Sequence, residues 1–297
     1  MSKPNYDQLH RFIFADANIR GELVQLGDSL RSVLDAQPYP VAIKRLLSEM
    51  MLATSLLTAT LKFKGEISLQ IQSEGALKYA VINGSDEQKM RGIARFESSI
   101  SDQPFAELVE KGMLAITIMP EKGQQYQGIV ALDKPSLAEC LKGYFEQSEQ
   151  LATEVVLHSR LDGDDSVAAG MLLQVIPGSD VSHQQQDNTF EHLSKLTQTI
   201  TRDELVDLPV QEILHRLYHE EEVTLFEPVP VIFSCTCSKE KISTALSGVP
   251  KEELLDILQE KGSIVTNCHY CFAEYQFSAA DIESLFVEQI GNPDIKH

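Results

Sequence analysis

Basic residues are scarce in this chain. Its 297 residues include 25 Lys and Arg against 44 Asp and Glu, which gives a formal net charge of −19. Acidic residues also outnumber basic ones in the C-terminal segment 231–297. Proteins that bind nucleic acid need clustered positive charge to contact the phosphates. The composition therefore argues against a nucleic-acid partner.

The sequence also lacks a long apolar run. Its most apolar stretch, residues 46–61, contains Glu49 and is shorter than the roughly 20 apolar residues that a membrane-spanning helix needs. Apolar residues occur on every side of its helical wheel, which is typical of a helix buried inside a domain. Pro40 stands where such a helix would begin. We therefore expect a buried core helix and no membrane partner.

The first seven residues do not have the pattern of a signal peptide. They contain no charged region followed by an apolar region. We therefore expect a cytoplasmic protein. In a reducing compartment, closely spaced cysteines are more often metal-binding or catalytic than structural disulfides.

The first 178 residues predict strands around the buried helix. Residues 66–72 alternate strictly between polar and apolar side chains, and residues 77–81 continue the pattern up to Asn83-Gly84, which predicts a turn. Residues 136–147 predict a helix. Further strands are predicted at 91–96, 113–119, 127–132, 155–159 and 171–175. Most of the connections are too short for parallel crossovers. Residues 1–178 therefore predict an α+β core domain of mainly antiparallel sheets packed on a buried helix.

A polar stretch follows the predicted core domain. Residues 177–188 show no periodicity and predict a loop. Two apolar stripes with helical spacing come next, and Pro228 and Pro230 mark the end of the segment. The stripes consist of Phe190, Leu193, Leu196 and Ile200, and of Ile213, Leu214, Leu217 and Tyr218. We interpret residues 179–230 as a helical linker without a core of its own.

Four of the five cysteines form two close pairs, Cys235-Thr236-Cys237 and Cys268-His269-Tyr270-Cys271. Structural zinc binds four ligands in a tetrahedron, and paired ligands from two distant segments close a small domain around one ion. We predict that Cys235, Cys237, Cys268 and Cys271 bind one Zn²⁺ per chain. Four thiolates leave no open position for water or substrate, so catalysis by the metal is not expected.

The predicted zinc-binding domain, residues 231–297, contains few apolar residues. Ser238 predicts the N-cap of one helix, and Pro250 opens a second helix that ends near Gly262. Residues 278–281 resemble a capping box before a third helix. Units of this size usually need a metal or disulfides to fold, so the ion would replace much of a core.

Other chemically reactive residues have simpler explanations. His215 and His219 have the spacing of metalloprotease zinc ligands, but Arg216 occupies the position of the catalytic glutamate in that motif. Cys140 lies in an apolar helical pattern, where a buried side chain is expected. The sequence contains no glycine-rich phosphate loop and no nucleophile elbow. We therefore find no enzyme signature.

Several segments, together with the two cysteine pairs, carry a family likeness. They are residues 7–11, 20–23, 52–63, 80–84, 90–95, 126–128, 144–151 and 216–223. A CxC pair combined with a CxxC pair at this separation is unusual among zinc folds. The chain closely resembles the heat shock protein 33 family of redox-regulated molecular chaperones over nearly its whole length.

The resemblance implies an ATP-independent holdase in the cytoplasm that binds unfolded or partly unfolded client proteins. It implies that oxidation releases zinc and forms the disulfides Cys235–Cys237 and Cys268–Cys271, and that the oxidised protein is a homodimer. Because metal-binding energy is folding energy in such domains, loss of zinc should unfold the terminal domain. The linker helices, expected to lie across the core domain, should then loosen and expose apolar surface.

Two other functions are compatible with the sequence. A zinc-stabilised adaptor would bind a folded partner whether its cysteines are reduced or oxidised. A thiol oxidoreductase would use Cys268 and Cys271 on a dithiol substrate. Its CxxC motif would follow a strand and open a helix, whereas residues typical of a strand follow the motif here.

Overall fold

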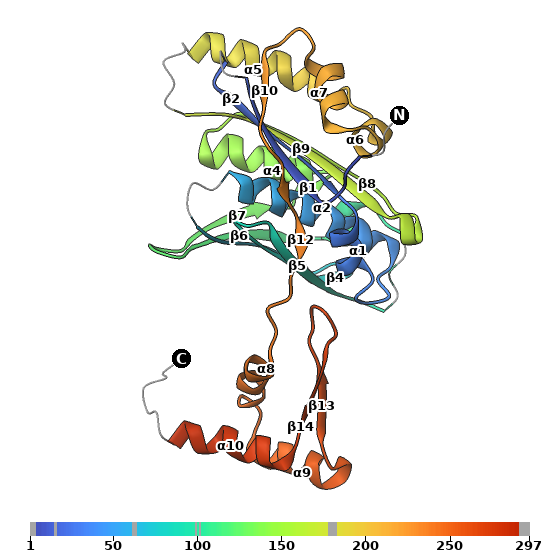
Figure 1. Ribbon diagram of the computed structural model, residues 1–297, viewed down its shortest axis with the longest axis vertical. Helices are drawn as coiled ribbons and strands as arrows, with labels where there is room; N and C mark the ends of the chain where they lie inside the picture. The colour runs from blue at the N-terminus through green and yellow to red at the C-terminus, as the bar shows by residue number, and fades with distance from the viewer. Residues whose placement is uncertain are drawn as a thin grey trace. The chain divides into compact units, whose positions relative to one another are not determined.

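The computed structural model describes residues 4–14, 17–60, 64–98, 100, 102–177 and 183–290. The fold is α+β with mainly antiparallel sheets, as predicted. Contacts divide the chain into two compact units, residues 1–234 and 235–297. Figure 1 shows the helices and strands of each unit.

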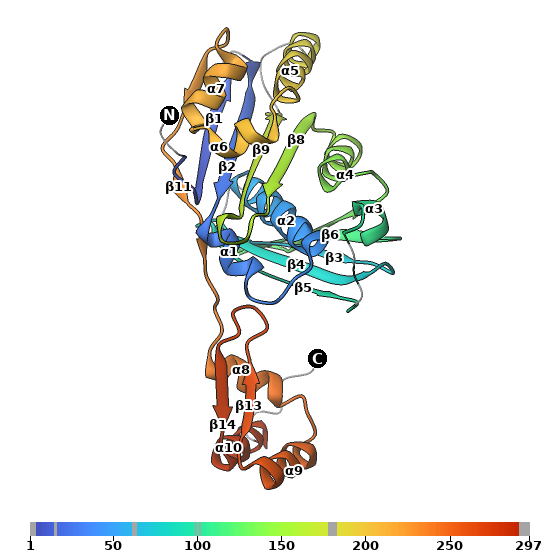
Figure 2. The same cartoon turned by 90° about the vertical axis from the view of Figure 1, so that its right-hand side faces the viewer.

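The first unit contains two six-stranded sheets with helix α2 (Val41–Ala59) between them (Figure 2). The first sheet has the order β10 (Val223–Leu225), β1 (Gln8–Phe14), β2 (Ile19–Leu26), β9 (Val167–Val175) and β8 (Thr153–Arg160), and β11 (Val229–Pro230) also pairs with β1. The second sheet has the order β12 (Ile232–Phe233), β5 (Lys89–Phe96), β4 (Leu77–Ser85), β3 (Gly65–Gln72), β6 (Met113–Pro120) and β7 (Tyr126–Ala131). Only β12 and β5 pair in parallel among the described strands.

Helix α2 is the buried helix predicted from the sequence. It begins directly after Pro40, and nearly all its side chains from Ala42 to Thr58 are buried. Its buried hydroxyl groups all have acceptors: those of Ser48, Thr54 and Thr58 each donate to the carbonyl four residues earlier, and that of Ser55 donates to the Gln88 side chain. A polar side chain bonded in this way can be buried at little cost. Among the described helices, none combines the length and apolar character needed to cross a membrane.

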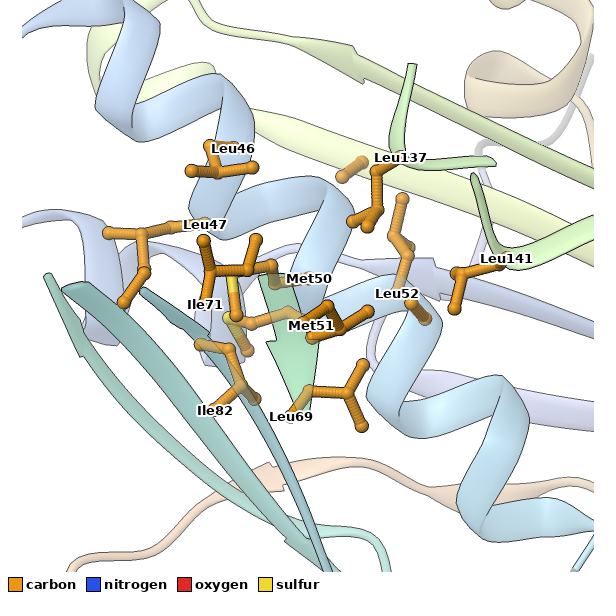
Figure 3. Close-up of a cluster of buried hydrophobic side chains, with 14 of the residues drawn as sticks. Leu46, Leu47, Met50, Met51, Leu52, Leu69, Ile71, Ile82, Leu137 and Leu141 are labelled. Carbon is orange, nitrogen blue, oxygen red and sulfur yellow. The ribbon is translucent and has the colours of Figure 1, made fainter. Parts of the chain in front are cut away.

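The main core forms where both sheets meet α2. Figure 3 shows Met50 and Met51 of α2 against strand side chains such as Ile71. Leu52 lies beside Leu137 and Leu141 of helix α4 (Leu137–Tyr144). The helix therefore joins the two sheets into one cluster of buried side chains.

Leu47 provides a test of this core because its side chain is fully buried. We expect Leu47→Ala to lower the free energy of unfolding of the first unit by about 2–5 kcal/mol, through lost contacts and a residual cavity. Urea unfolding of the reduced protein, followed by circular dichroism, measures the change. Val41→Ala is the control on the same helix, because Val41 is 41% exposed and its truncation should cost about 0.5 kcal/mol or less. Equal losses for the two variants would contradict this account of the core.

All strands predicted between residues 66 and 175 are present, and α4 has Ser136 as its N-cap. The turn predicted at Asn83-Gly84 is wrong. Both residues lie inside β4, and the turn follows at Asp86 and Glu87. A Cβ on Gly84 would lie 2.9 Å from Thr54 Cγ2. Glycine therefore serves the close approach of α2 at this position.

Strands β1 and β2 were not predicted from the sequence. Six of the eight residues of β2 are buried in succession after Arg20, so polar and apolar positions do not alternate along it. Leu23 belongs to a cluster on one face of the first sheet, whereas Val24 belongs to the α2 cluster on the other face. A strand covered on both faces loses the period-two pattern that identifies half-buried strands.

Three helices cover the face of the first sheet that points away from α2 (Figure 2). They are α5 (His183–Thr197), α6 (Arg202–Asp207) and α7 (Val210–Tyr218). The loop predicted over residues 177–188 is wrong from His183 onward, because α5 begins there; residues 178–182 lie outside the described residues. Gln186 is buried and its amide donates to the carbonyls of Ala17 and Asn18, both at 3.4 Å. A polar side chain with such partners can occupy a buried helix position that periodicity does not reveal.

The apolar stripes of α5 and α7 pack on the sheet, in a cluster with Phe12, Leu23 and Met171. Polar contacts accompany them. The Tyr218 hydroxyl lies 2.7 Å from Thr197 Oγ1. The Gln25 amide donates to the carbonyls of Leu205 in α6 and of Leu208, the residue that ends this helix. After α7, the chain runs along the edges of both sheets as β10, β11 and β12, which were not predicted from the sequence.

The described residues of the second unit, 235–290, form three helices and a hairpin. The elements are α8 (Lys239–Leu246), α9 (Lys251–Lys261), β13 (Ile264–Asn267), β14 (Glu274–Phe277) and α10 (Ala279–Ile290). The predicted end signals are confirmed: Ser238 caps α8, Pro250 precedes α9, and Gly262 ends it with φ 76°. Ser278 and Asp281 exchange hydrogen bonds at the start of α10. Among the residues whose burial is described, the core cluster of this unit consists of Leu254, Leu258, Ile264, Phe277 and Ile282.

Candidate metal centre

The structure brings the four paired cysteines together. Cys235 and Cys237 precede α8, and Cys268 and Cys271 lie in the turn between β13 and β14. Their four sulfur atoms all lie within 4.8 Å of one another. The closest approaches join the two segments, with Cys235 3.6 Å from Cys268 and Cys237 3.4 Å from Cys271 between sulfurs. No other group of three or more candidate metal ligands occurs in the described part of the chain.

The donor set fits a tetrahedral metal ion. Zinc–sulfur bonds of about 2.3 Å place the sulfurs of a tetrahedron about 3.8 Å apart. The two measured separations, 3.6 and 3.4 Å, are close to this value. All four cysteines are free thiols. They are therefore positioned to bind a metal ion.

Hydrogen bonds to backbone groups fix both cysteine segments. The amide of Cys268 donates to the carbonyl of Ala273 at 2.9 Å, and the amide of Phe272 donates back to Cys268. Phe272 has φ 58°, and its carbonyl accepts from the Asn267 side chain. In the other segment, Lys241 Nζ donates to the Thr236 carbonyl at 2.8 Å. The sulfurs are thus presented by turns whose geometry is set by neighbouring residues.

The four thiols differ in their surroundings. Cys268 is buried, whereas the other three are partly exposed. The Tyr275 hydroxyl donates to Cys237 Sγ at 3.1 Å, and this hydrogen bond lowers the pKa of Cys237 to about 7. Burial raises the pKa of Cys235 to about 12. Because a divalent cation favours the deprotonated thiolates, metal binding at this cluster must release protons.

Tyr275 was not singled out as a site residue by its sequence context. It precedes Phe277 by two positions in β14, so the two side chains leave the same face of the strand. Phe277 is fully buried in the small core, and Tyr275 packs against that core. This alternation after the second cysteine pair is the signal that could have identified it.

The turn containing Cys268 and Cys271 leads from β13 into β14 and does not open a helix. In thiol oxidoreductases, the N-terminus of a helix lowers the pKa of the attacking cysteine. That feature is missing next to this pair within the described hairpin. The arrangement argues against an oxidoreductase of that type.

The other candidate residues lie apart from the cysteine cluster. His215 lies on α7 and His219 is the C-cap residue of that helix, with ring centroids 6.0 Å apart, and no third candidate ligand joins them among the described residues. Cys140 is 3% exposed, and burial raises its pKa. The expectation of a buried Cys140 is thus confirmed.

Comparisons with known proteins agree over nearly the whole chain. A family model described as Hsp33 protein matches residues 7–278. The 33 kDa chaperonin of Pseudoalteromonas atlantica is 51% identical over 283 residues, covering 95% of each chain. That of Shewanella loihica is 51% identical over 281 residues, covering 94% of this chain and 96% of its own. The crystal structure of the 33 kDa chaperonin from Thermotoga maritima has the same fold, with a TM-score of 0.82 at 20% identity over 97% of this chain and 100% of its own.

Proposed function

Because the chain belongs to the Hsp33 family of chaperones, we propose that it is an ATP-independent holdase switched on by oxidation of the four-cysteine cluster. In the reduced protein, Cys235, Cys237, Cys268 and Cys271 hold one Zn²⁺. Oxidation forms the disulfides Cys235–Cys237 and Cys268–Cys271 and releases the metal. The observation that carries the proposal is the gathering of four thiols from two segments in a unit with a very small core.

The chemistry of the switch follows from the ligands. Each disulfide requires two thiolates to give up two electrons, which reduce one peroxide molecule to two waters with the uptake of two protons. A disulfide sulfur is a much poorer metal ligand than a thiolate. Oxidation of either pair therefore removes two of the four ligands. The tight ring of a Cys235–Cys237 disulfide should be strained and readily reduced, which makes the switch reversible.

Release of the metal should unfold the second unit. Structural zinc contributes roughly 10–16 kcal/mol of apparent binding free energy near neutral pH in small zinc domains, and that energy is also folding energy. Five buried apolar residues form the centre of this unit's core. Such a core supplies little stability of its own. The unit is therefore stable only while the cluster is reduced and metal-bound.

The chain just before Cys235 offers a route from the second unit to the helices on the first sheet. β12 pairs with β5 through two residues, and β11 pairs with β1 through two more. The Ser234 amide, next to Cys235, donates to Met90. Short edge pairings of this kind open at low free energy. Once the second unit unfolds, these pairings lose the ordered segment that follows them, and the linker is freed from its C-terminal end.

The interface beneath the linker helices suits reversible opening. The buried carboxylate of Glu154 on β8 accepts hydrogen bonds from Ser194 and Gln198 of the α5 segment and from Lys142. When α5 leaves, water can replace Ser194 and Gln198, while Lys142 of α4 stays paired with Glu154. Separation therefore costs less than for a wholly apolar interface. Separation would expose the apolar residues that the helices cover, including Phe12 and Leu23. We propose that this face, with the linker stripes, binds unfolded clients.

We assign residues 1–178 to the core domain, 179–230 to the linker and 231–297 to the redox switch. The protein acts in the cytoplasm as a holdase without an enzymatic activity of its own, and it forms a homodimer when oxidised. The net charge of −19 would help to keep the opened form in solution while apolar surface is exposed.

The test is suppression of aggregation of a thermally unfolding protein. We expect little protection by reduced, zinc-loaded protein and strong protection after treatment with peroxide at raised temperature, reversed by dithiothreitol. An adaptor would bind its partner equally in both redox states. A thiol oxidoreductase would turn over a dithiol substrate with little dependence on zinc. Equal protection before and after oxidation would contradict the proposed switch.

A further inference from the structure

We infer that Tyr275 is a positioning residue of the metal centre, which strengthens metal binding and slows oxidation through a hydrogen bond to the Cys237 sulfur. The inference builds on the proposed zinc switch and adds a determinant of its sensitivity to oxidants. It starts from the 3.1 Å contact between the Tyr275 hydroxyl and Cys237 Sγ.

The position of this hydroxyl is fixed by the fold of the second unit. Tyr275 pairs with Thr266 across the β13–β14 hairpin. This register fixes the position of the Tyr275 backbone relative to the turn that contains Cys268 and Cys271. The ring packs against the small core next to Phe277, which is fully buried. The backbone and the ring therefore hold the hydroxyl at the sulfur without any contribution from Cys237 itself.

Cys237 is a position where such a contact matters. It is partly exposed, so a small oxidant can reach it, and its sulfur lies 3.4 Å from that of Cys271 in the other cysteine segment. It also directly precedes Ser238, the N-cap of α8. A change at this sulfur therefore affects the contact between the two cysteine segments and the start of a helix.

The chemistry of oxidation explains the effect. A thiolate lone pair attacks a peroxide oxygen, the O–O bond breaks, and a sulfenic acid and hydroxide form; a second thiolate then attacks that sulfur and expels hydroxide. A hydrogen bond from Tyr275 occupies a lone pair of Cys237 and stabilises its negative charge. The sulfur is then a weaker nucleophile towards peroxide. Hydrogen-bond partners of metal ligands typically change metal affinity by about 10–100-fold when they are removed.

The first experiment replaces the hydroxyl and keeps the ring. We expect Tyr275→Phe to weaken zinc binding by about 10-fold or more in a chelator competition, because one partner of a ligand is lost. Peroxide should release zinc faster from this variant, and differential alkylation with mass spectrometry should show earlier modification of Cys237. Tyr79→Phe is the matched control, since it removes the hydroxyl of a strand tyrosine in the first unit. Its zinc affinity and release rate should equal those of the unmodified chain.

Two further measurements separate this role from a packing role. In protein loaded with Co²⁺, loss of the hydrogen bond should shift the sulfur-to-metal charge-transfer band to lower energy. Incorporation of 3-fluorotyrosine at position 275 makes the hydroxyl a stronger donor, so it should slow the oxidation of Cys237. If Tyr275→Phe fails to fold, the oxidation rate of Cys237 in the fluorinated protein still tests the inference. A packing role alone would leave the charge-transfer band unmoved and would not give opposite effects for the two changes.

The inference is overturned if Tyr275→Phe binds zinc with unchanged affinity and Cys237 is oxidised at an unchanged rate. That result would leave the proposed function intact as long as oxidation still activates the protein. Failure of the proposed function would be seen in a different protein sample. The unmodified protein would then bind no zinc through its cysteines or would show no response to oxidation.

Discussion

Removal of zinc from the reduced protein by a chelator is expected to unfold residues of about 232–287 and to leave the two sheets and α2 folded. The reason is the difference in core size. The first unit has two large apolar clusters, whereas the second has one small cluster around Phe277. Loss of roughly 10–16 kcal/mol of metal-binding free energy exceeds what so small a core can replace.

Hydrogen exchange measured by mass spectrometry resolves the two units in one experiment. Peptides from α9, β13 and β14 should exchange at the rates of an unfolded chain after chelation, while peptides from α2, β3 and β9 keep their protection. Addition of Zn²⁺ to the reduced protein should restore protection in the second unit, which controls for damage by the chelator. Simultaneous loss of protection in both units would show that they fold as one, contrary to the separation proposed here.

Periodicity predicted the parts of the fold that have one dominant environment. The helix around Met50 is apolar on all sides because both sheets cover it, and β3 alternates because one of its faces packs on that helix. Periodicity fails to predict a strand when other elements cover both of its faces. β2 places Leu23 on the linker helices and Val24 on α2, so both of its faces are buried.

Short elements and polar burial could not be predicted from the sequence. β11 and β12 each pair through two residues, which is too short for any periodicity to be measured. The polar side chain of Gln186 favours a loop in the sequence pattern. Its buried position in a helix is explained only by its hydrogen bonds to the carbonyls of Ala17 and Asn18. These partners are more than 160 positions away in the chain, so only the tertiary structure reveals them.

The metal centre was more predictable than the fold that holds it. Cysteine pairs with this spacing restrict the chemistry strongly, because few side chains other than cysteine and histidine can build a structural zinc site. The structure then gathers all four sulfurs within 4.8 Å. The alternation after the second cysteine pair could have identified Tyr275, but it could not reveal the hydrogen bond from its hydroxyl to Cys237. That hydrogen bond depends on the register of a hairpin, which no spacing of cysteines specifies.

Loss of one metal ligand is expected to activate the protein without an oxidant. Cys268→Ser should break the cluster at its buried member, lower the zinc content well below one per chain, and unfold the second unit. Because oxidation acts by removing the same metal-derived folding energy, the variant should suppress aggregation in reducing buffer. We expect its basal activity to rise from near zero to the level of the oxidised, unmodified protein.

Cys140→Ser is the matched control for this experiment. It makes the same chemical change at a buried cysteine that belongs to the core cluster of the first unit and lies outside the metal centre. It should keep one zinc per chain, stay inactive in reducing buffer and respond normally to peroxide. The two variants therefore separate loss of a thiol from loss of the metal. If Cys268→Ser remained folded, zinc-bound and inactive towards unfolded proteins, the energy of the metal site would not restrain the chaperone, and a constitutive adaptor would explain the cluster better.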